Sequence, residues 1–214
     1  MDERNSHYRL ESSRNGLTVP VINDVYLHSI YNPVKEAETF AKTHENNLKV
    51  KNNILILGLG FGYHVEEVAK LVNSFHQDYN IIILEPNKRL VEDFINTRNF
   101  EDKRIKIINT DSVKELFNSW EFVQFLMTKP CIVKHDSSFI IEKDFYSKFL
   151  SYQASTDMYH IRSLANEHTK ELVAEVEEVS MSSLFDRIQS NGIQSRNDYF
   201  LMAYKNLTQN TQGK

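Results

Sequence analysis

The stretch Asn53-Ile-Leu-Ile-Leu-Gly-Leu-Gly-Phe-Gly-Tyr-His64 decides the fold of this chain. Residues 54–57 form a short, continuous apolar run, which is typical of a parallel strand buried on both faces. A helical pattern begins at Val65, so the glycines between them lie in a strand-to-helix turn. Glycine lets the backbone bend sharply and lets a ligand come close to the backbone. The free N–H groups at the start of the following helix would face that ligand. The stretch therefore predicts the first βα unit of a nucleotide-binding fold, with its turn at Gly58, Gly60 and Gly62.

The spacing of the glycines favours one class of nucleotide over another. The dinucleotide fingerprint G-x-G-x-x-G needs glycine at position 63, where this chain has Tyr63. The pattern G-x-G-x-G is instead similar to the first motif of S-adenosylmethionine-dependent methyltransferases. Those enzymes usually carry an acid two residues before the first glycine, and this chain has Ile56 there, which resembles the variant found in polyamine (aminopropyl) synthases.

Two acidic residues follow the next two predicted strands. Residues 81–84 form a second apolar run that ends at Glu85, where such folds accept hydrogen bonds from ribose hydroxyls. Residues 105–108 form a third and lead to Asp111, where methyltransferases often contact the adenine. Each acid could instead sit at the start of a helix, and for Asp111, followed by Ser112, the capping role is the commoner one. The candidate cofactor-binding residues, for S-adenosylmethionine or another nucleotide, are Gly58, Gly60, Gly62, Tyr63, His64, Glu85 and Asp111.

Composition excludes several other functions. The 214 residues carry a net charge of −4 with scattered Lys and Arg, so no nucleic-acid surface is expected. No apolar run approaches the length of roughly 18–20 residues that spans a bilayer, and the N-terminus lacks a signal-peptide pattern. The single cysteine, Cys131, fits a reducing compartment, so a cytoplasmic protein is expected. The eight histidines form no H-x-x-x-H pair with acidic partners, and no metal site is predicted.

The order of elements predicts an α/β fold. Short β-type runs over residues 17–22 and 25–27 indicate a hairpin after a frayed, polar N-terminus, and Asn32 with Pro33 starts a helix that reaches about Thr43. From there strands and helices alternate, with a helix over 63–75, one ending near Thr97, one over about 112–127 and a fourth strand over 132–134. This alternation predicts a Rossmann-like, methyltransferase-like parallel sheet flanked by helices. We expect a tail with short strands over residues 1–25, the Rossmann-like domain over 26–150 and a helical C-terminal extension over 151–214.

The C-terminal extension carries an apolar stripe at spacings of three and four residues, which is typical of an amphipathic helix. The pattern predicts one long helix over about 147–179, a length suggestive of packing on a second copy or a partner protein. The stripe consists of Met158, Ile161, Ala165, His168, Leu172, Val176 and Val179.

Several separated motifs together resemble one bacterial family. They lie at residues 26–38, 54–64, 84–87 and 131–138, with Phe145-Tyr146 beyond them. In this order they resemble the N-terminal region of the motility accessory factors, which are associated with glycosylating flagellin by nonulosonic acids. In that family the transferase function is attributed to a larger central domain that follows a Rossmann-like one, and this chain ends about where that domain would begin. The resemblance implies an accessory or nucleotide-binding domain, and no catalytic residue can be carried over.

Three functions stay open on the sequence. The chain is an accessory domain of surface glycosylation, or a methyltransferase-like enzyme that binds S-adenosylmethionine, with chemistry around residues 134–138. The third alternative is a structural domain whose glycine turn is occupied by its own side chains, such as Phe61.

Overall fold

The computed structural model describes residues 7–154 and, beyond them, only single residues and pairs between 157 and 203. The chain divides into two compact units, residues 1–152 and 153–214. Within the described residues, no helix combines the length and the apolar character that a membrane crossing requires.

The core of the first unit is a four-stranded parallel sheet with the order β6-β5-β4-β7. Its strands are β4 (Asn53–Leu57), β5 (Asn80–Leu84), β6 (Ile105–Ile108) and β7 (Cys131–Lys134). The two central strands pair in register from Asn53↔Asn80 to Leu57↔Leu84, and their apolar residues are buried on both faces. This confirms the predicted Rossmann-like α/β fold, in which the order of the strands reverses between β4 and β7.

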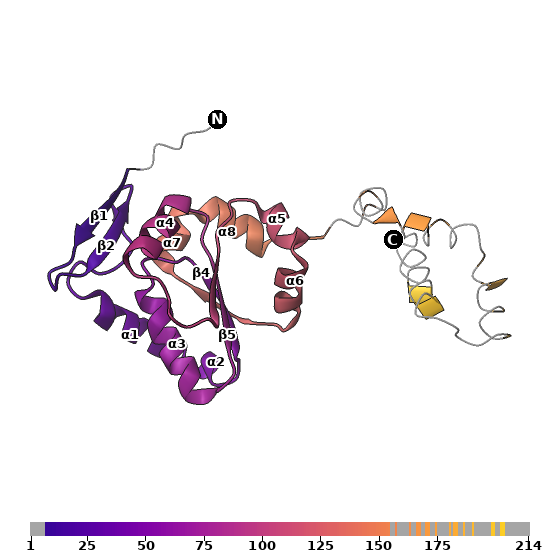
Figure 1. The fold of residues 1–214 in the computed structure, drawn as a ribbon, viewed down its shortest axis with the longest axis horizontal. Coiled ribbons are helices and arrows are strands. Elements are labelled where there is room, and N and C mark those ends of the chain that lie inside the picture. Colours follow the sequence, from indigo (N-terminus) through magenta and orange to yellow (C-terminus); the bar gives the residue numbers. More distant parts are fainter. Residues whose placement is uncertain are drawn as a thin grey trace. The chain divides into compact units, whose positions relative to one another are not determined.

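Helices cover both faces of this sheet (Figure 1). On one face pack α1 (Pro33–Thr43), α2 (Glu45–Leu48), α3 (Tyr63–Phe75) and α4 (Lys88–Thr97). On the other pack α5 (Val113–Asn118), α6 (Trp120–Met127) and α8 (Lys143–Leu150), with α7 (Asp136–Ile141) directly after β7. The bounds of α1, α3 and α4 are those that capping residues and apolar periodicity predict.

A small antiparallel sheet precedes the main one. It consists of β1 (Tyr8–Ser12), β2 (Thr18–Ile22) and β3 (Val25–Tyr26), and it lies near α4 and α7 (Figure 1). The prediction of a frayed N-terminus was wrong for β1. Its polar residues face solvent on an edge strand, while the backbone pairs with β2 from Tyr8↔Ile22 to Ser12↔Thr18.

Two predicted helices differ from the structure. The helix expected over 112–127 is two helices, because the Ser119 side chain accepts a hydrogen bond from the Phe122 N–H and starts α6. The long helix expected over 147–179 is interrupted at its beginning, since α8 ends at Leu150 and residues 152–154 are not helical. All seven residues of the apolar stripe lie outside the described residues.

Candidate functional site

The glycine turn lies where ligands bind in open α/β sheets. It follows β4 at the carboxyl end of the sheet, next to the reversal of strand order between β4 and β7. Gly58, Gly60 and Gly62 all have positive φ, at 105°, 55° and 83°. Gly62 is also the N-cap residue of α3. A side chain other than glycine is strained at these angles, so the backbone explains why glycines stand here.

Side chains of the protein itself fill the space that faces these glycines. A Cβ built on Gly58 would lie 2.7 Å from Ser138 Oγ, and one built on Gly60 would lie 2.5 Å from His28 Nε2 and 3.1 Å from His135 Cε1. The contacts with Ser138 Oγ and His28 Nε2 are closer than a real Cβ tolerates, and the contact with His135 Cε1 is tight. A ligand that approached Gly58 or Gly60 from this side would have to displace these side chains.

Glu85, at the tip of β5, bonds to the backbone. One carboxylate oxygen accepts a hydrogen bond from the Leu59 N–H at 2.8 Å, and the other accepts one from the Asn87 N–H at 3.0 Å. The residue is 1% exposed, and burial raises the pKa of its carboxyl group to about 7 against the opposing effect of these two bonds. Glu85 thus ties the glycine turn to the start of α4.

The space beside the Glu85 carboxylate is narrow. It has no room for a water molecule. The N-terminal sheet and the segment after it contribute Ile22 and Leu27 to its lining, and α7 contributes Ser138 and Ile141. A ribose on this carboxylate would need the N-terminal sheet or α7 to move.

Three buried histidines meet under the turn, although they are far apart in the sequence. His28 lies between β3 and α1, His64 in the first turn of α3, and His135 between β7 and α7. The rings of His64 and His135 stack at 4.2 Å between centroids and 10° between planes. The ring of His28 lies 4.9 Å from that of His135 and 5.5 Å from that of His64.

Each of these rings is tied to the backbone or to a neighbouring side chain. The Phe61 N–H donates to His28 Nε2 at 2.9 Å, and His64 Nε2 lies 3.0 Å from the Gly58 carbonyl oxygen. His135 Nδ1 lies 2.8 Å from Ser138 Oγ. Burial lowers the pKa of all three imidazoles, so they are neutral near pH 7. The expectation that the chain has no metal site is not confirmed, since one ring nitrogen of each histidine lies within 4.8 Å of the other two.

Two of the predicted residues have other contacts. The Tyr63 hydroxyl donates to the Thr18 carbonyl oxygen at 2.9 Å, and the Arg98 guanidinium lies 3.9 Å from the centre of the Tyr63 ring. Asp111 is exposed, and its neighbour Ser112 caps α5 by accepting a hydrogen bond from the Glu115 N–H. Sequence reasoning placed Gly58, His64 and Glu85 at the turn but did not assemble His28 and His135 with them.

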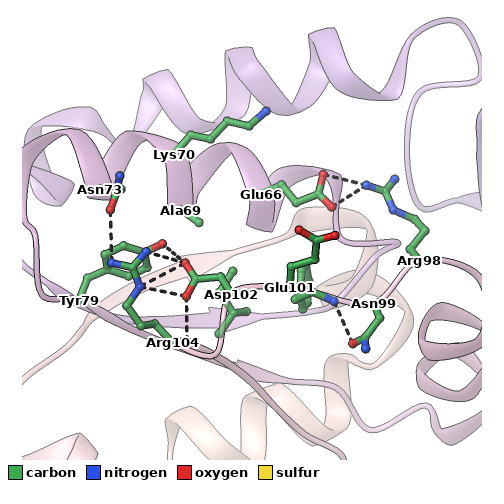
Figure 2. Close-up of a pocket in the computed structure, with 12 residues that line it drawn as sticks. Glu66, Ala69, Lys70, Asn73, Tyr79, Arg98, Asn99, Glu101, Asp102 and Arg104 are labelled. Atoms are coloured by element: carbon green, nitrogen blue, oxygen red, sulfur yellow. Dashed lines mark hydrogen bonds and ion pairs between the residues drawn. The ribbon is translucent and has the colours of Figure 1, made fainter.

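A separate hollow of about 430 Å³ runs along α3 and the segment that joins α4 to β6 (Figure 2). Its two arginines are already paired: Arg98 contacts both carboxylate oxygens of Glu66 at 2.7 Å, and Arg104 contacts Asp102 at 2.8 Å. Arg104 also stacks on Tyr79, whose hydroxyl donates to Asp102. These pairs neutralise the charge that an anionic ligand would need.

Comparisons with known proteins give likenesses of fold. No protein-family model matches the chain, and no curated protein matches it, so the resemblance to motility accessory factors stays a prediction. Among solved structures, MNMC2 from Aquifex aeolicus is similar at 15% identity and a TM-score of 0.35, over 55% of this chain and 47% of that one. The spermidine synthase of Thermotoga maritima is similar at 15% identity and a TM-score of 0.43, over 55% and 42%.

A spermidine synthase in complex with the transition state analogue AdoDATO gives the same identity and TM-score, over 55% of this chain and 41% of that one. The chain therefore matches less than half the length of each of these structures.

Proposed function

We propose that this chain is an accessory Rossmann-like domain that retains the backbone of a nucleotide site and fills it with its own side chains. The observation that carries the proposal is the occupation of the glycine turn. His28 and His135 stand within contact distance of a Cβ at Gly60, and Ser138 stands within contact distance of one at Gly58. This is the space that a ligand needs at the reversal of strand order.

Displacing the side chains that fill the glycine turn costs free energy. Moving His28 leaves the buried Phe61 N–H without its acceptor, and a lost buried hydrogen bond costs about 1–3 kcal/mol. A ribose at Glu85 would also have to enter a space with no room for water. A ligand must offset both costs before it gains any affinity, which favours a domain that works without one.

The resemblance to motility accessory factors supplies the context of this proposal. We infer a cytoplasmic protein that assists bacterial surface glycosylation, with flagellin as the first acceptor to examine. Residues 151–214 would contact a second copy or a partner protein. The apolar stripe in that segment supports an interface of this kind.

A second candidate is an enzyme that binds S-adenosylmethionine and acts on a small molecule. Glu85 favours it, because this carboxylate stands at the tip of β5, where ribose hydroxyls are bound in such folds, and lies beside the glycine turn. This candidate requires a second conformation in which His28 and the N-terminal sheet leave the turn.

Deletion of the gene tests the accessory function. The masses of flagellin and other surface proteins are then measured in the deletion strain and in a strain complemented with the intact gene. The proposal expects reduced glycan occupancy that complementation restores, and that the variant Glu85→Gln restores as well. Unchanged protein masses in the deletion strain would contradict it.

A further inference from the structure

The three histidines under the glycine turn have the arrangement of metal ligands. They come from the segment before α1, from the first turn of α3 and from the end of β7, and all are buried. One ring nitrogen of each lies within 4.8 Å of those of the other two. Nitrogen ligands of a tetrahedral zinc ion are roughly 3.4 Å apart, given Zn–N distances of about 2.0–2.1 Å. The ring nitrogens must therefore move closer together by up to about 1.4 Å to reach this spacing, which side-chain rotation can supply.

The outer hydrogen bonds of the rings determine where their lone pairs lie. His64 Nε2 donates to the Gly58 carbonyl oxygen, so its Nδ1 carries the lone pair. His28 Nε2 accepts from the Phe61 N–H, so its proton is on Nδ1, 3.5 Å from a Glu36 carboxylate oxygen. A ligating histidine usually donates its other ring N–H to a carboxylate or a backbone carbonyl in this way.

The third ring, that of His135, places its Nδ1 2.8 Å from Ser138 Oγ. His64 and His28 thus each direct one N–H to a carbonyl or carboxylate oxygen of the protein and carry a lone pair on the other ring nitrogen.

One of these lone pairs has no partner among the described residues. His64 Nδ1 is buried, and within that part of the chain it makes no hydrogen bond. Buried polar atoms are nearly always paired, and such an atom calls for an explanation. A metal ion shared with His28 and His135 supplies one.

We propose that His28, His64 and His135 bind one divalent transition-metal ion, with zinc the first candidate. Imidazole ligands suit zinc, copper, iron and nickel, and three of them leave a fourth position of a tetrahedral ion for water or for Ser138 Oγ. The ion would join the N-terminal segment, the start of α3 and the end of β7. This site goes beyond the accessory function proposed above and does not depend on it.

Binding requires a local change. The stacked rings of His64 and His135 lie in nearly parallel planes, so their lone pairs cannot meet at one ion until the rings turn out of the stack. The Phe61 N–H and the Ser138 hydroxyl also lose their present acceptors. The ion has to offset these losses, so its affinity is itself a test of the site.

The experiment is a zinc titration of the full chain, stripped with a chelator and followed by calorimetry and thermal unfolding. We expect one ion per chain, with a midpoint of unfolding raised by roughly 5–10 °C at a hundredfold excess over Kd. His64→Gln and His135→Gln should each weaken zinc binding at least tenfold. His76→Gln is the matched control, since that ring bonds the Leu48 carbonyl outside the cluster and its loss should leave binding unchanged.

A second measurement does not depend on whether the variants fold. X-ray absorption on the wild-type zinc complex should show nitrogen and oxygen ligands with the scattering pattern of three imidazoles. Failure of the wild-type chain to bind zinc, cobalt or nickel at micromolar concentration overturns the proposal. So does binding of equal strength in both cluster variants, because the ion would then lie elsewhere in the chain.

Discussion

Replacing Gly60 by alanine tests directly whether His28 occupies the glycine turn. The new Cβ would lie 2.5 Å from His28 Nε2, at a residue whose φ is +55°. Two costs follow. The left-handed backbone costs a non-glycine residue about 1–2 kcal/mol, and moving His28 off the Phe61 N–H costs about 1–3 kcal/mol more. We expect Gly60→Ala to lower the free energy of unfolding by about 2–5 kcal/mol.

A double-mutant cycle separates these two costs. In a His28→Ala background the ring is gone and the Phe61 N–H has already lost its acceptor, so Gly60→Ala should cost mainly the backbone strain of about 1–2 kcal/mol. The tight contact with His135 Cε1, at 3.1 Å, is common to both backgrounds. Gly16→Ala is the matched control, since Gly16 also has a positive φ, +81°, but nothing lies within 4 Å of its added Cβ. Its cost should be the same in both backgrounds.

The assay is urea unfolding of the full chain followed by far-ultraviolet circular dichroism, with a chelator present so that metal binding does not contribute. The quantity of interest is the difference between the cost of Gly60→Ala in the two backgrounds. A difference of about 1–3 kcal/mol is expected. A difference below about 0.5 kcal/mol, within the usual error of additivity, would refute the conclusion that His28 fills the turn.

Three further predictions concern neighbouring features. Burial raises the Glu85 pKa from 4.5 to about 7, so the folded state holds that proton more tightly than the unfolded state. The stability of the wild type relative to Glu85→Gln should therefore fall by about 3 kcal/mol as pH rises from about 4.5 to 7.5. A stability difference in urea unfolding that does not change with pH would contradict this. Asn87→Ala removes the side-chain acceptor for the Leu90 N–H and should cost about 0.5–2 kcal/mol in the same assay, whereas no loss would show that α4 needs no cap. Arg98→Lys gives up the contact with both carboxylate oxygens of Glu66 and the stacked position on the Tyr63 ring. We expect the free energy of unfolding to fall by about 0.5–1.5 kcal/mol, and by less in high salt. A decrease that does not depend on salt would point to packing alone.

The parts of the fold that the sequence predicted rest on local patterns. A few neighbouring residues are enough to determine these parts of the structure. They are the apolar runs that form β4 and β5, the three glycines of the turn, and the Asn32-Pro33 start of α1. The division at Ser119 was missed because apolar residues continue on both sides of it. The strand β1 was missed because its stability comes from pairing with β2, not from its own residues.

The filled turn could not be predicted from the same patterns. Glycines at 58, 60 and 62 are compatible with a ligand and with a close-packed side chain, and only the tertiary structure distinguishes these. His28 and His135 reach the turn through the path of the chain before α1 and after β7. No local spacing relates them to His64, so a search for short histidine motifs could not find the cluster.

The central claim is that the chain fills its own nucleotide site, and titration calorimetry tests it most directly. Purified protein would be titrated with S-adenosylhomocysteine and, in parallel, with cytidine nucleotides. We expect no saturable heat from either ligand, which corresponds to a Kd above about 1 mM, or a binding free energy weaker than about −4 kcal/mol. Saturable binding of S-adenosylhomocysteine near 1 µM, about −8 kcal/mol, would contradict it and support the enzyme. Equally tight binding of cytidine nucleotides alone would contradict it too, and would assign the turn to sugar-nucleotide chemistry.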